Sequence, residues 1–402
     1  MTFDTMSAEE RFRLDHGEKQ HVPHSYVRLL YCSSVSPQAV AAGELLVYRH
    51  LRARPSRSVM VVAPDHKPVD EDIEPAVSIS VPPAPKFVQR LRRHVLWSVA
   101  DALAGSLVKA RFTEQADRFR PQAVCSTLLP DSLLTAAASY AKERRLPLVL
   151  FCHDDYSDAV PPAGRRHLAR IYRQAAVRFC VSSVMEREFF RRYGVRGTLL
   201  PPIPGHAPRP PQVQRAEDPL VVGFAGSIGV GYMEAMLRLA EALHRVGGRL
   251  VIASPTDRNL TPPVWQHPAV QDLGALRPDE VLSRFTAAGV NAVAVIQSFD
   301  PAERRAFRLN FPSKLAEYAT FGLPVLVVAP DDASASLWLK DRPGVAILVD
   351  GLVPAQFAAA VERLRDADSR RQLAENIHAA AMEFDPATLH QRFETALGGV
   401  CH

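Results

Sequence analysis

Short runs of apolar residues recur along the chain, and most are followed by a segment in which apolar residues return at helical spacing. The runs lie at 26–31, 58–63, 121–129, 146–152, 177–183 and 198–202, and then at 220–224, 249–254, 291–296, 325–328 and 345–349, and a further strand is predicted around 270–273. Apolar runs of this length are typical of strands buried on both faces of a parallel sheet. Their alternation with helical segments predicts an α/β protein.

Two stretches without apolar periodicity divide this pattern. Residues 1–24 are polar and charged, which predicts a loosely ordered leader. Residues 204–218 hold many prolines and predict a linker between a first domain at 25–203 and a second domain that begins at 219. The 402 residues are enough for two domains of roughly 200 residues each.

The composition is that of a soluble globular protein, with 47% hydrophobic and 23% charged residues. No apolar run approaches the length of a membrane span, and the first twenty residues lack the apolar centre of a signal peptide, so we expect a cytoplasmic protein. The five cysteines show no C-x-x-C pairing and are interpreted as buried apolar residues. A net charge of +5 is mild, and we expect no nucleic-acid partner.

The segment 310–328 carries the most specific chemistry. Pro312 fits the start of a helix, and the amides near Ser313 and Lys314 would lie unpaired at its positive end. Together with the lysine, such a helix start suits a phosphate. Glu317 lies one turn further, where its carboxylate could accept hydrogen bonds from ribose hydroxyls. The segment therefore indicates a nucleotide-sugar donor site, and the alternative is an ordinary amphipathic helix with a solvated face.

Polar residues follow the apolar run 146–152. His153 and Asp154 would lie at the carboxyl end of a central parallel strand, where open α/β sheets place ligands. An imidazole beside a carboxylate could orient an acceptor hydroxyl or take its proton. The alternative is that these residues only cap the strand.

Two glycine-containing turns are candidates for contact with the donor. Gly226 and Ser227 open a glycine-rich turn between a predicted strand and a predicted helix, where backbone amides can cradle phosphates. Gly43 follows the first strand in a loop of small residues that would let a ligand approach the backbone. Many such turns bind nothing, and this alternative stays open for both.

An acidic triplet and a basic segment suggest two further kinds of partner. Asp70 and Asp72 form an Asp-x-Asp pattern, but they lie in a proline-bounded loop without a strong strand before it, and we predict no metal site. Residues 86–103 form a basic amphipathic pattern that predicts a helix. This helix could contact an anionic membrane surface, or it could pack on the core with a solvated basic side.

The order Pro312-Ser313-Lys314, Glu317-Tyr318 and Gly322-x-Pro324 resembles the donor-binding helix of retaining glycosyltransferases of the two-Rossmann (GT-B) type, close to family 4. The resemblance covers about residues 25–400. It implies two Rossmann-like domains facing each other across a cleft, a second domain that ends near 382, and a terminal helix at 383–402 that packs back on the first domain.

The resemblance also implies roles for individual residues. Gly43 would lie against the donor diphosphate, His153 would face the donor sugar with Asp154 as its companion, and Phe311 would join the donor-binding residues. In three places the chain departs from the usual family pattern. Leu309 stands where the family usually has a first glutamate, Ser227 where it has an arginine, and Val230 near the place of a lysine.

The function implied is transfer of a hexose from a nucleoside diphosphate sugar to a hydroxyl of a sugar or a lipid-linked glycan, in polysaccharide or glycoconjugate biosynthesis. Retention of configuration and the absence of a metal or other cofactor follow from the resemblance alone. Two alternatives stay open. One is a nucleotide-sugar epimerase of the same architecture, and the other is a non-catalytic partner subunit, which the three departures from the family pattern make credible.

Overall fold

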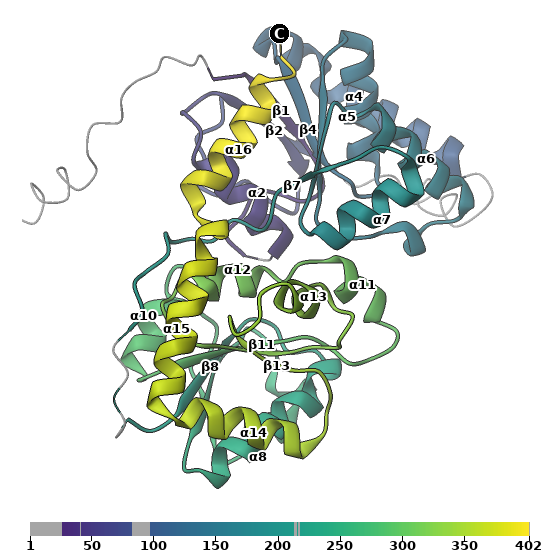
Figure 1. Cartoon of the computed structure of the whole chain (residues 1–402). Coiled ribbons are helices and arrows are strands. Elements are labelled where there is room, and N and C mark those ends of the chain that lie inside the picture. The colour runs from purple at the N-terminus through teal and green to yellow at the C-terminus, as the bar shows by residue number, and fades with distance from the viewer. Residues whose placement is uncertain (1–25, 41, 83–96, 213–214, 216–217, 402) are drawn as a thin grey trace, which may run out of the picture.

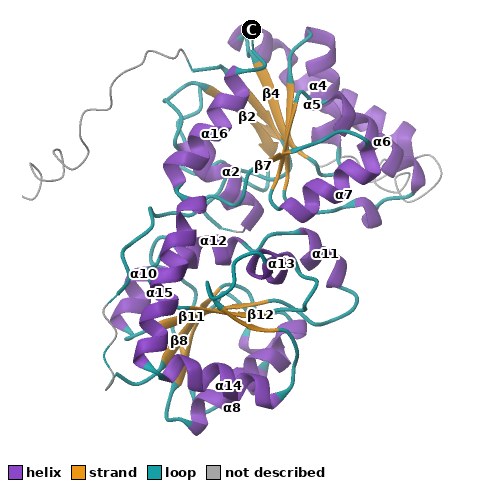
Figure 2. Ribbon diagram, viewed as in Figure 1, coloured by secondary structure: helices purple, strands orange, loops and turns teal. Residues whose placement is uncertain are grey.

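The computed structural model contains two parallel β-sheets, one above the other in Figure 1, each covered by helices on both faces. It describes residues 26–40, 42–82, 97–212, 215 and 218–401. The expected leader at 1–24 and the part of the predicted basic helix at 86–96 lie outside the described residues. Figure 2 shows the same layers, with strands enclosed between helices.

The first sheet has seven strands in the order β3-β2-β1-β4-β5-β6-β7, and every pairing is parallel. The strands are β1 (Leu29–Cys32), β2 (Val59–Pro64), β3 (Val77–Val81), β4 (Ala123–Thr127), β5 (Leu148–Cys152), β6 (Val177–Cys180) and β7 (Thr198–Leu199). The helices are α2 (Ala42–Arg52), α4 (Trp97–Phe119), α5 (Ser132–Arg144), α6 (Pro162–Gln174) and α7 (Ser183–Tyr193), with a 3₁₀ turn at Ser157–Ala159. Every residue of β1, β2, β4 and β5 is buried, which explains their continuous apolar sequences.

The second sheet has six parallel strands in the order β10-β9-β8-β11-β12-β13. They are β8 (Val221–Ala225), β9 (Arg249–Ala253), β10 (Val270–Asp272), β11 (Ala292–Ile296), β12 (Val325–Val328) and β13 (Ile347–Val349). The helices are α8 (Met233–Arg245), α9 (Pro262–Trp265), α10 (Val281–Ala287), α11 (Arg304–Leu309), α12 (Ser313–Ala319), α13 (Ser334–Lys340), α14 (Pro354–Arg365) and α15 (Ala367–Ala381). The 3₁₀ turns are Val230–Tyr232, Arg258–Leu260 and Met382–Phe384.

The last helix, α16 (Pro386–Gly398), leaves the second domain and packs on the first (Figure 1). The ring of Phe393 lies among His50, Phe151 and Phe179, with centroid distances of 4.9, 5.5 and 5.6 Å. Glu394 forms an ion pair with Arg54 of the first domain. The chain therefore crosses between the domains twice, once through the linker and once before α16.

The prediction of two Rossmann-like domains with parallel sheets is confirmed. The predicted helix at 86–103 was wrong in its end, because α4 continues to Phe119. Its small residues Gly105 and Ser106 look like a helix end in sequence, but a Cβ at Gly105 would lie only 2.7 Å from Thr135 of α5, so the glycine serves close helix packing. The strand β3 and the helices α6, α13 and α15 were not predicted.

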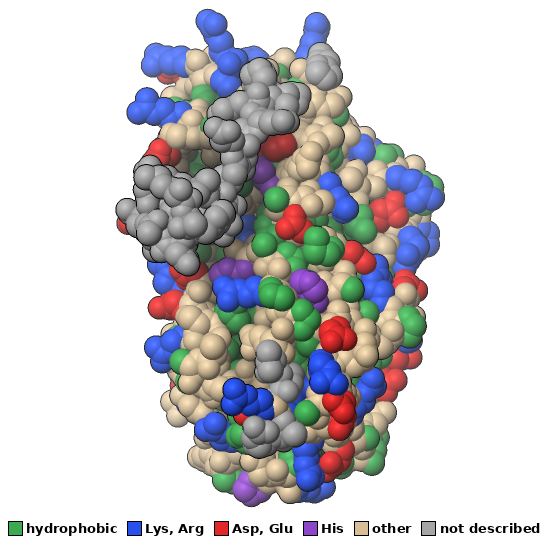
Figure 3. Space-filling model, turned by 60° about the vertical axis from the view of Figure 1, so that its left-hand side comes forward, with side chains coloured by type: hydrophobic (Ala, Val, Ile, Leu, Met, Phe, Trp, Pro, Cys, Tyr) green, Lys and Arg blue, Asp and Glu red, His purple; other side chains and the backbone are tan. Residues whose placement is uncertain are grey.

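Figure 3 shows the molecule after a turn about the vertical axis that brings the left-hand side of Figure 1 to the front. Lysine and arginine side chains lie among aspartate and glutamate side chains on this face. The small excess of positive charge is therefore not gathered there into one large basic patch. No helix among the described residues is both long and apolar enough to span a bilayer.

Candidate active site between the two domains

A cavity of about 550 Å³ lies where the carboxyl ends of the two sheets face each other. Its walls come from loops after β1, β5, β8 and β11 and from the start of α12, which is where open parallel sheets place ligands. All nine residues that the sequence singled out line this cavity, namely Gly43, His153, Asp154, Gly226, Ser227, Phe311, Ser313, Lys314 and Glu317. Residues that are 274 positions apart in sequence, from 43 to 317, thus share one site.

Lys314 is a cation without an acidic partner at the wall of this cavity. Its Nζ lies 4.4 Å from the centre of the Phe224 ring and 6.0 Å from that of Tyr232. No ion pair or hydrogen bond of its ammonium occurs among the described residues. Burial lowers the pKa of Lys314 to about 8. An ammonium that has lost water and has no carboxylate beside it favours an anionic ligand.

The absence of a side chain at Gly226 leaves space for the side chain of Lys314. A Cβ at this position would lie 2.7 Å from Nζ of Lys314, and the backbone φ of +124° is one that residues with side chains rarely adopt. The amide of Gly226 already donates to the carbonyl of Ala253 at 2.8 Å. Gly226 therefore shapes the site by its missing side chain, and its own N–H is not available to cradle a phosphate. Ser227 is exposed at the rim of the same turn.

The helix α12 is fixed to the end of β8 by one tyrosine. The hydroxyl of Tyr318 accepts a hydrogen bond from the amide of Ala225 at 2.7 Å, and Leu315 and Tyr318 are buried in the core. Pro312 precedes the first turn, and no side chain caps it. The amides of Ser313 and Lys314 have no hydrogen-bond acceptor among the described residues, so they remain available to a ligand.

Glu317 lies at the junction of the two domains and already has partners. One carboxylate oxygen accepts a hydrogen bond from Arg49 of α2 at 2.6 Å, and the amide of Gly205 lies 3.2 and 3.3 Å from the two oxygens. Arg49 also donates to the carbonyl of Ile203 at 2.7 Å. These contacts orient the carboxylate at the cavity wall and leave lone pairs for further donors, because a carboxylate has about four acceptor sites.

His153 follows β5 and lies against the first turn of α2, so Gly43 belongs to the helix and not to the loop predicted before it. Its Nε2 lies 3.3 Å from the hydroxyl of Tyr156 and 3.4 Å from the carboxylate of Asp154, while its buried Nδ1 has no hydrogen-bond partner in the part of the chain that the structure describes. A Cβ at Gly43 would lie 2.7 Å from Nε2 of His153, so Gly43 is the residue that lets the imidazole reach this position. Burial lowers the pKa of His153, although the charge of Asp154 opposes this shift. The imidazole is therefore neutral near pH 7.

Asp154 and Phe311 have contacts that differ in kind. Asp154 accepts hydrogen bonds from the hydroxyl of Tyr156 at 2.9 Å and from the side-chain amide of Asn310 in the second domain. Phe311 is 8% exposed, and its ring packs on Trp338 and Phe384. Asp154 thus joins the two domains at the cavity, whereas Phe311 is mostly a core residue that shows one edge to the site.

Two polar residues that line the cavity, Gln297 and Asn310, and Arg49 beside Glu317 were missed in the sequence. Arg49 holds Glu317, Asn310 bonds to Asp154, and Gln297 lies buried after β11 with its Oε1 unpartnered. Gln297 follows the apolar strand β11, which is the same signal that led to His153, whereas Asn310 follows the arginine-rich helix α11 and carries no such signal. Arg49 lies inside a helix, and its sequence carries no local signal for a contact 268 residues away.

Two side chains of the acidic triplet have hydrogen-bond partners within the first domain. Asp70 accepts a hydrogen bond from the amide of Ala39 at 3.1 Å, and Asp72 accepts one from the hydroxyl of Tyr48 at 2.7 Å. Within the described ranges, no group of three histidine, cysteine or acidic side chains lies close enough together to hold a metal ion.

The comparison with known families agrees with this architecture. Residues 44–204 match the family model for Glycosyltransferase Family 4. The chain has the GT-B fold, and this segment of its first domain is similar to Glycosyltransferase Family 4. A GT-B structure of Anabaena Alr3699/HepE in complex with UDP and glucose matches with a TM-score of 0.63 and 15% identity, over 93% of this chain and 100% of that chain.

Two further solved structures are similar. The lipopolysaccharide outer core galactosyltransferase WaaB matches with a TM-score of 0.60 and 15% identity, over 92% of this chain and 99% of that one. A glycosyltransferase from Rickettsia africae ESF-5 matches with a TM-score of 0.63 and 10% identity, over 94% and 99%. At these identities the likeness establishes the GT-B fold. No curated protein sequence matches this chain.

Proposed function

We propose that this chain transfers a hexose from a nucleoside diphosphate sugar to a hydroxyl of a sugar or lipid-linked glycan. The observation that carries the proposal is the unpaired ammonium of Lys314 at the start of α12, inside a cavity that the two domains form together. The HepE structures that resemble this chain contain UDP and UDP-glucose, which supports a nucleotide sugar as the donor.

The diphosphate would lie against Lys314 and the free amides of Ser313 and Lys314. When the bond between sugar and diphosphate breaks, negative charge develops on the leaving diphosphate, and fixed donors in a dry site stabilise it. The usual family cations are replaced by Ser227 and Val230, and neither can supply a charge. The ammonium of Lys314 and the two free amides would therefore stabilise this charge, and we propose that no metal ion takes part.

Glu317 would accept hydrogen bonds from the ribose hydroxyls while Arg49 keeps its carboxylate in place. His153 and Asp154 lie on the opposite wall, in the first domain, and would face the transferred sugar or the acceptor hydroxyl. A neutral imidazole can accept a hydrogen bond from a sugar hydroxyl. Retention of configuration is part of the proposal.

A peripheral contact with an anionic membrane is a further part of the proposal. On α4 the side chains of Val99, Leu103 and Leu107 are 65%, 44% and 48% exposed and share one helix face. The adjoining α6 exposes Arg165, Arg166 and Arg170. Apolar side chains flanked by arginines suit the interface of an anionic bilayer. Flotation with phosphatidylglycerol vesicles tests this, and Leu103→Glu should abolish binding if the surface is correct.

The transferase proposal is tested by turnover. Purified protein is incubated with UDP-, GDP-, ADP- and dTDP-sugars, and release of the nucleoside diphosphate and of free sugar is measured. Slow release from one donor, lost in Lys314→Met and kept in Lys142→Met, is the expected result. A free isomerised sugar would identify an epimerase. Tight binding of one nucleotide without any release would favour the partner-subunit alternative, to which Leu309, Ser227 and Val230 still point.

A further inference from the structure

A second cavity, of about 330 Å³, lies between α7 of the first domain and α11 of the second. Five arginines line it together with one acidic and three apolar residues, namely Arg187, Arg191, Arg192, Arg305 and Arg308 with Glu188, Val184, Leu309 and Leu337. We call this cavity the arginine pocket. None of its residues lines the donor cavity described above.

Three of the arginines are neutralised by nearby carboxylates. Arg191 pairs with Glu188 at 2.7 Å, and Arg192 lies 2.6 Å from Glu188 and 2.9 Å from Asp155. The side chain of Asp155 is only 3% exposed. Burial raises its pKa, but the hydrogen bonds and charge of Arg192 outweigh this, so the pKa of Asp155 lies below its usual value.

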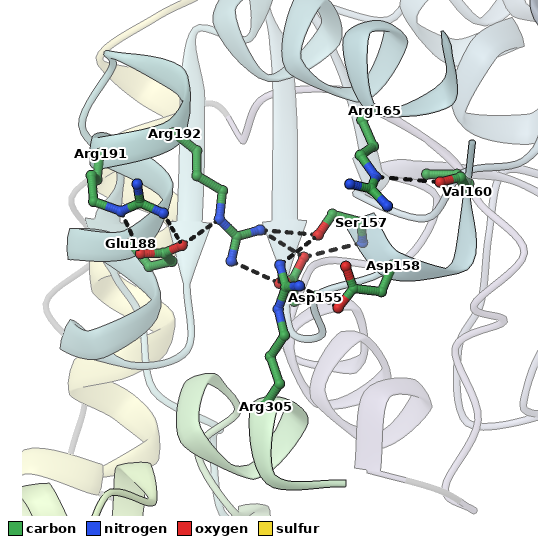
Figure 4. Close-up of polar contacts among 9 residues, drawn as sticks. All are labelled: Asp155, Ser157, Asp158, Val160, Arg165, Glu188, Arg191, Arg192 and Arg305. Carbon is green, nitrogen blue, oxygen red and sulfur yellow. Dashed lines mark hydrogen bonds and ion pairs between the residues drawn. The ribbon is translucent and has the colours of Figure 1, made fainter. Parts of the chain in front are cut away.

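Arg305 joins this network from the opposite domain. It lies 3.1 Å from Asp155 and also pairs with Asp158. Figure 4 shows Arg192 and Arg305 pointing at the carboxylate of Asp155 from two sides. The five guanidinium groups thus face three carboxylates, and two positive charges are in excess.

The two excess charges lie on different domains. Arg187 belongs to α7 and Arg308 to α11, and neither has an ion pair or side-chain hydrogen bond among the described residues. Guanidinium groups bind phosphate through paired N–H donors, and several arginines around one cavity are typical of phosphate recognition. An anion that bridges Arg187 and Arg308 would also hold the two domains together.

The arginine pocket adjoins the donor cavity. Asp154 lines the donor cavity and the next residue, Asp155, binds the arginine network; likewise Asn310 lines the donor cavity and Leu309 the pocket. The pocket lies on the right of Figure 1, where α7 faces α11, whereas α16 crosses between the domains on the left. A ligand that reaches His153 from this side of the cleft would pass the pocket.

We propose that the arginine pocket binds a phosphate-type anion, and that this anion is a phosphate group of the acceptor. The second half rests on the proposed function, because it presumes that an acceptor enters the cleft. The first half stands on the pocket alone. The substrate class inferred is therefore an acceptor that carries a phosphate or diphosphate near the hydroxyl to be glycosylated.

Calorimetric titration with pyrophosphate, in the presence of excess UDP to fill the donor cavity, tests the site. Arg187→Gln/Arg308→Gln should weaken pyrophosphate binding at least tenfold, while Arg363→Gln, an exposed arginine on α14, should leave it within twofold. UDP affinity should not change in any variant. Pyrophosphate binding that is absent in the wild type, or equally strong in the double variant, would overturn the proposal. Failure of UDP to bind would count against the donor site alone.

The source of the anion is decided by turnover with the donor found above. If the anion belongs to the acceptor, the double variant loses transfer to phosphorylated sugars and keeps the slow release of sugar to water. If free pyrophosphate instead changes that release in the wild type but not in the double variant, the pocket binds a separate anion, and the acceptor assignment is wrong.

Discussion

At the scale of the residue, burial decides the protonation of two groups in this protein. It lowers the pKa of Lys314 to about 8 and that of His50 to about 3. For both groups the charged form is the one that loses water, so both pKa values move downward. Lys314 lies at a cavity where a bound anion can offset this cost. His50 is enclosed by the core, and neither of its ring nitrogens has a hydrogen-bond partner among the described residues.

The shifted pKa of Lys314 predicts that nucleotide affinity depends on pH. Below pH 8 the free protein carries the ammonium, and above pH 8 it must first take up a proton to bind a diphosphate. We expect the affinity for UDP to fall roughly tenfold for each pH unit well above 8. Titration calorimetry from pH 7 to 9.5 measures this. The same decline in Lys314→Met would show that another group is responsible.

His50 predicts a loss of stability in acid. Its pKa is lowered in the folded protein, so between pH 6.5 and 3 the unfolded chain binds a proton that the folded chain does not. The free energy of unfolding therefore decreases as the pH is lowered through this range. The loss should reach about 2 kcal/mol at pH 5. Urea unfolding at pH 8 and pH 5 tests this, because His50→Phe should be about 2 kcal/mol less sensitive to this change. Equal sensitivity would contradict the buried neutral imidazole.

At the scale of the element, helices of different domains meet through charged side chains. Helix α2 reaches α12 through Arg49 and Glu317, and α11 reaches the loop after β5 through Arg305 and Asp155. Such pairs cost desolvation when they form, but removing one partner leaves a buried charge without compensation. The element contacts are therefore specific even where their net contribution to stability is small.

Arg192→Gln should destabilise the protein by about 2–3 kcal/mol, because it removes a cation from the buried Asp155. Arg191→Gln is the matched control, since Arg191 is 71% exposed and pairs only with Glu188. We expect less than about 1 kcal/mol for the control. Urea unfolding at pH 7 measures both. Equal losses would mean that the burial of Asp155 has no energetic consequence.

The sequence predicts elements best where one local signal is strong. Continuous apolar runs indicated β1, β2, β4, β5 and, apart from β10, the strands of the second sheet. The strand β3 reads Val-Ser-Ile-Ser-Val at the sheet edge, with alternating exposure. It follows directly after an acidic loop, so its short alternating pattern was not recognised as a strand. The helix α15 has a long polar face, so its apolar positions did not stand out.

The parts of the site that the sequence indicated are also those with a strong local signal. Lys314 and Glu317 share one short helix with a clear start, and His153 directly follows a buried strand. The partnership of Glu317 with Arg49 and the use of the Gly226 amide by Ala253 depend on how distant segments meet. The types of these residues therefore do not indicate that they are in contact.

At the scale of the whole molecule, the two domains are tied by the linker, by α16 and by the polar contacts across the cavity. Arg54 and Glu394, and the aromatic group around Phe393, fix α16 to the first domain. The relative position of the two domains therefore depends on contacts made by several distant parts of the chain. A ligand bound in the cavity would touch both domains and add to these ties.

Phe393→Ala should release α16 from the first domain and cost about 3–5 kcal/mol, because the ring is fully buried among side chains of that domain. Phe357→Ala, in the core of the second domain, is the control of equal size. Hydrogen exchange over 386–398 should accelerate strongly in Phe393→Ala and remain slow in Phe357→Ala. Protected amides in both variants would show that α16 does not depend on this contact.

The central claim is that the cavity between the domains holds a nucleoside diphosphate through Lys314 and Glu317. Thermal unfolding with UDP, GDP, ADP and dTDP tests it most directly, on the wild type, Lys314→Met, Glu317→Gln and the surface controls Lys142→Met and Glu375→Gln. One nucleotide at about 100 times its Kd should stabilise the wild type and both controls by roughly 2.7 kcal/mol, and neither cavity variant. No stabilisation by any nucleotide, or equal stabilisation of all five proteins, would contradict the account.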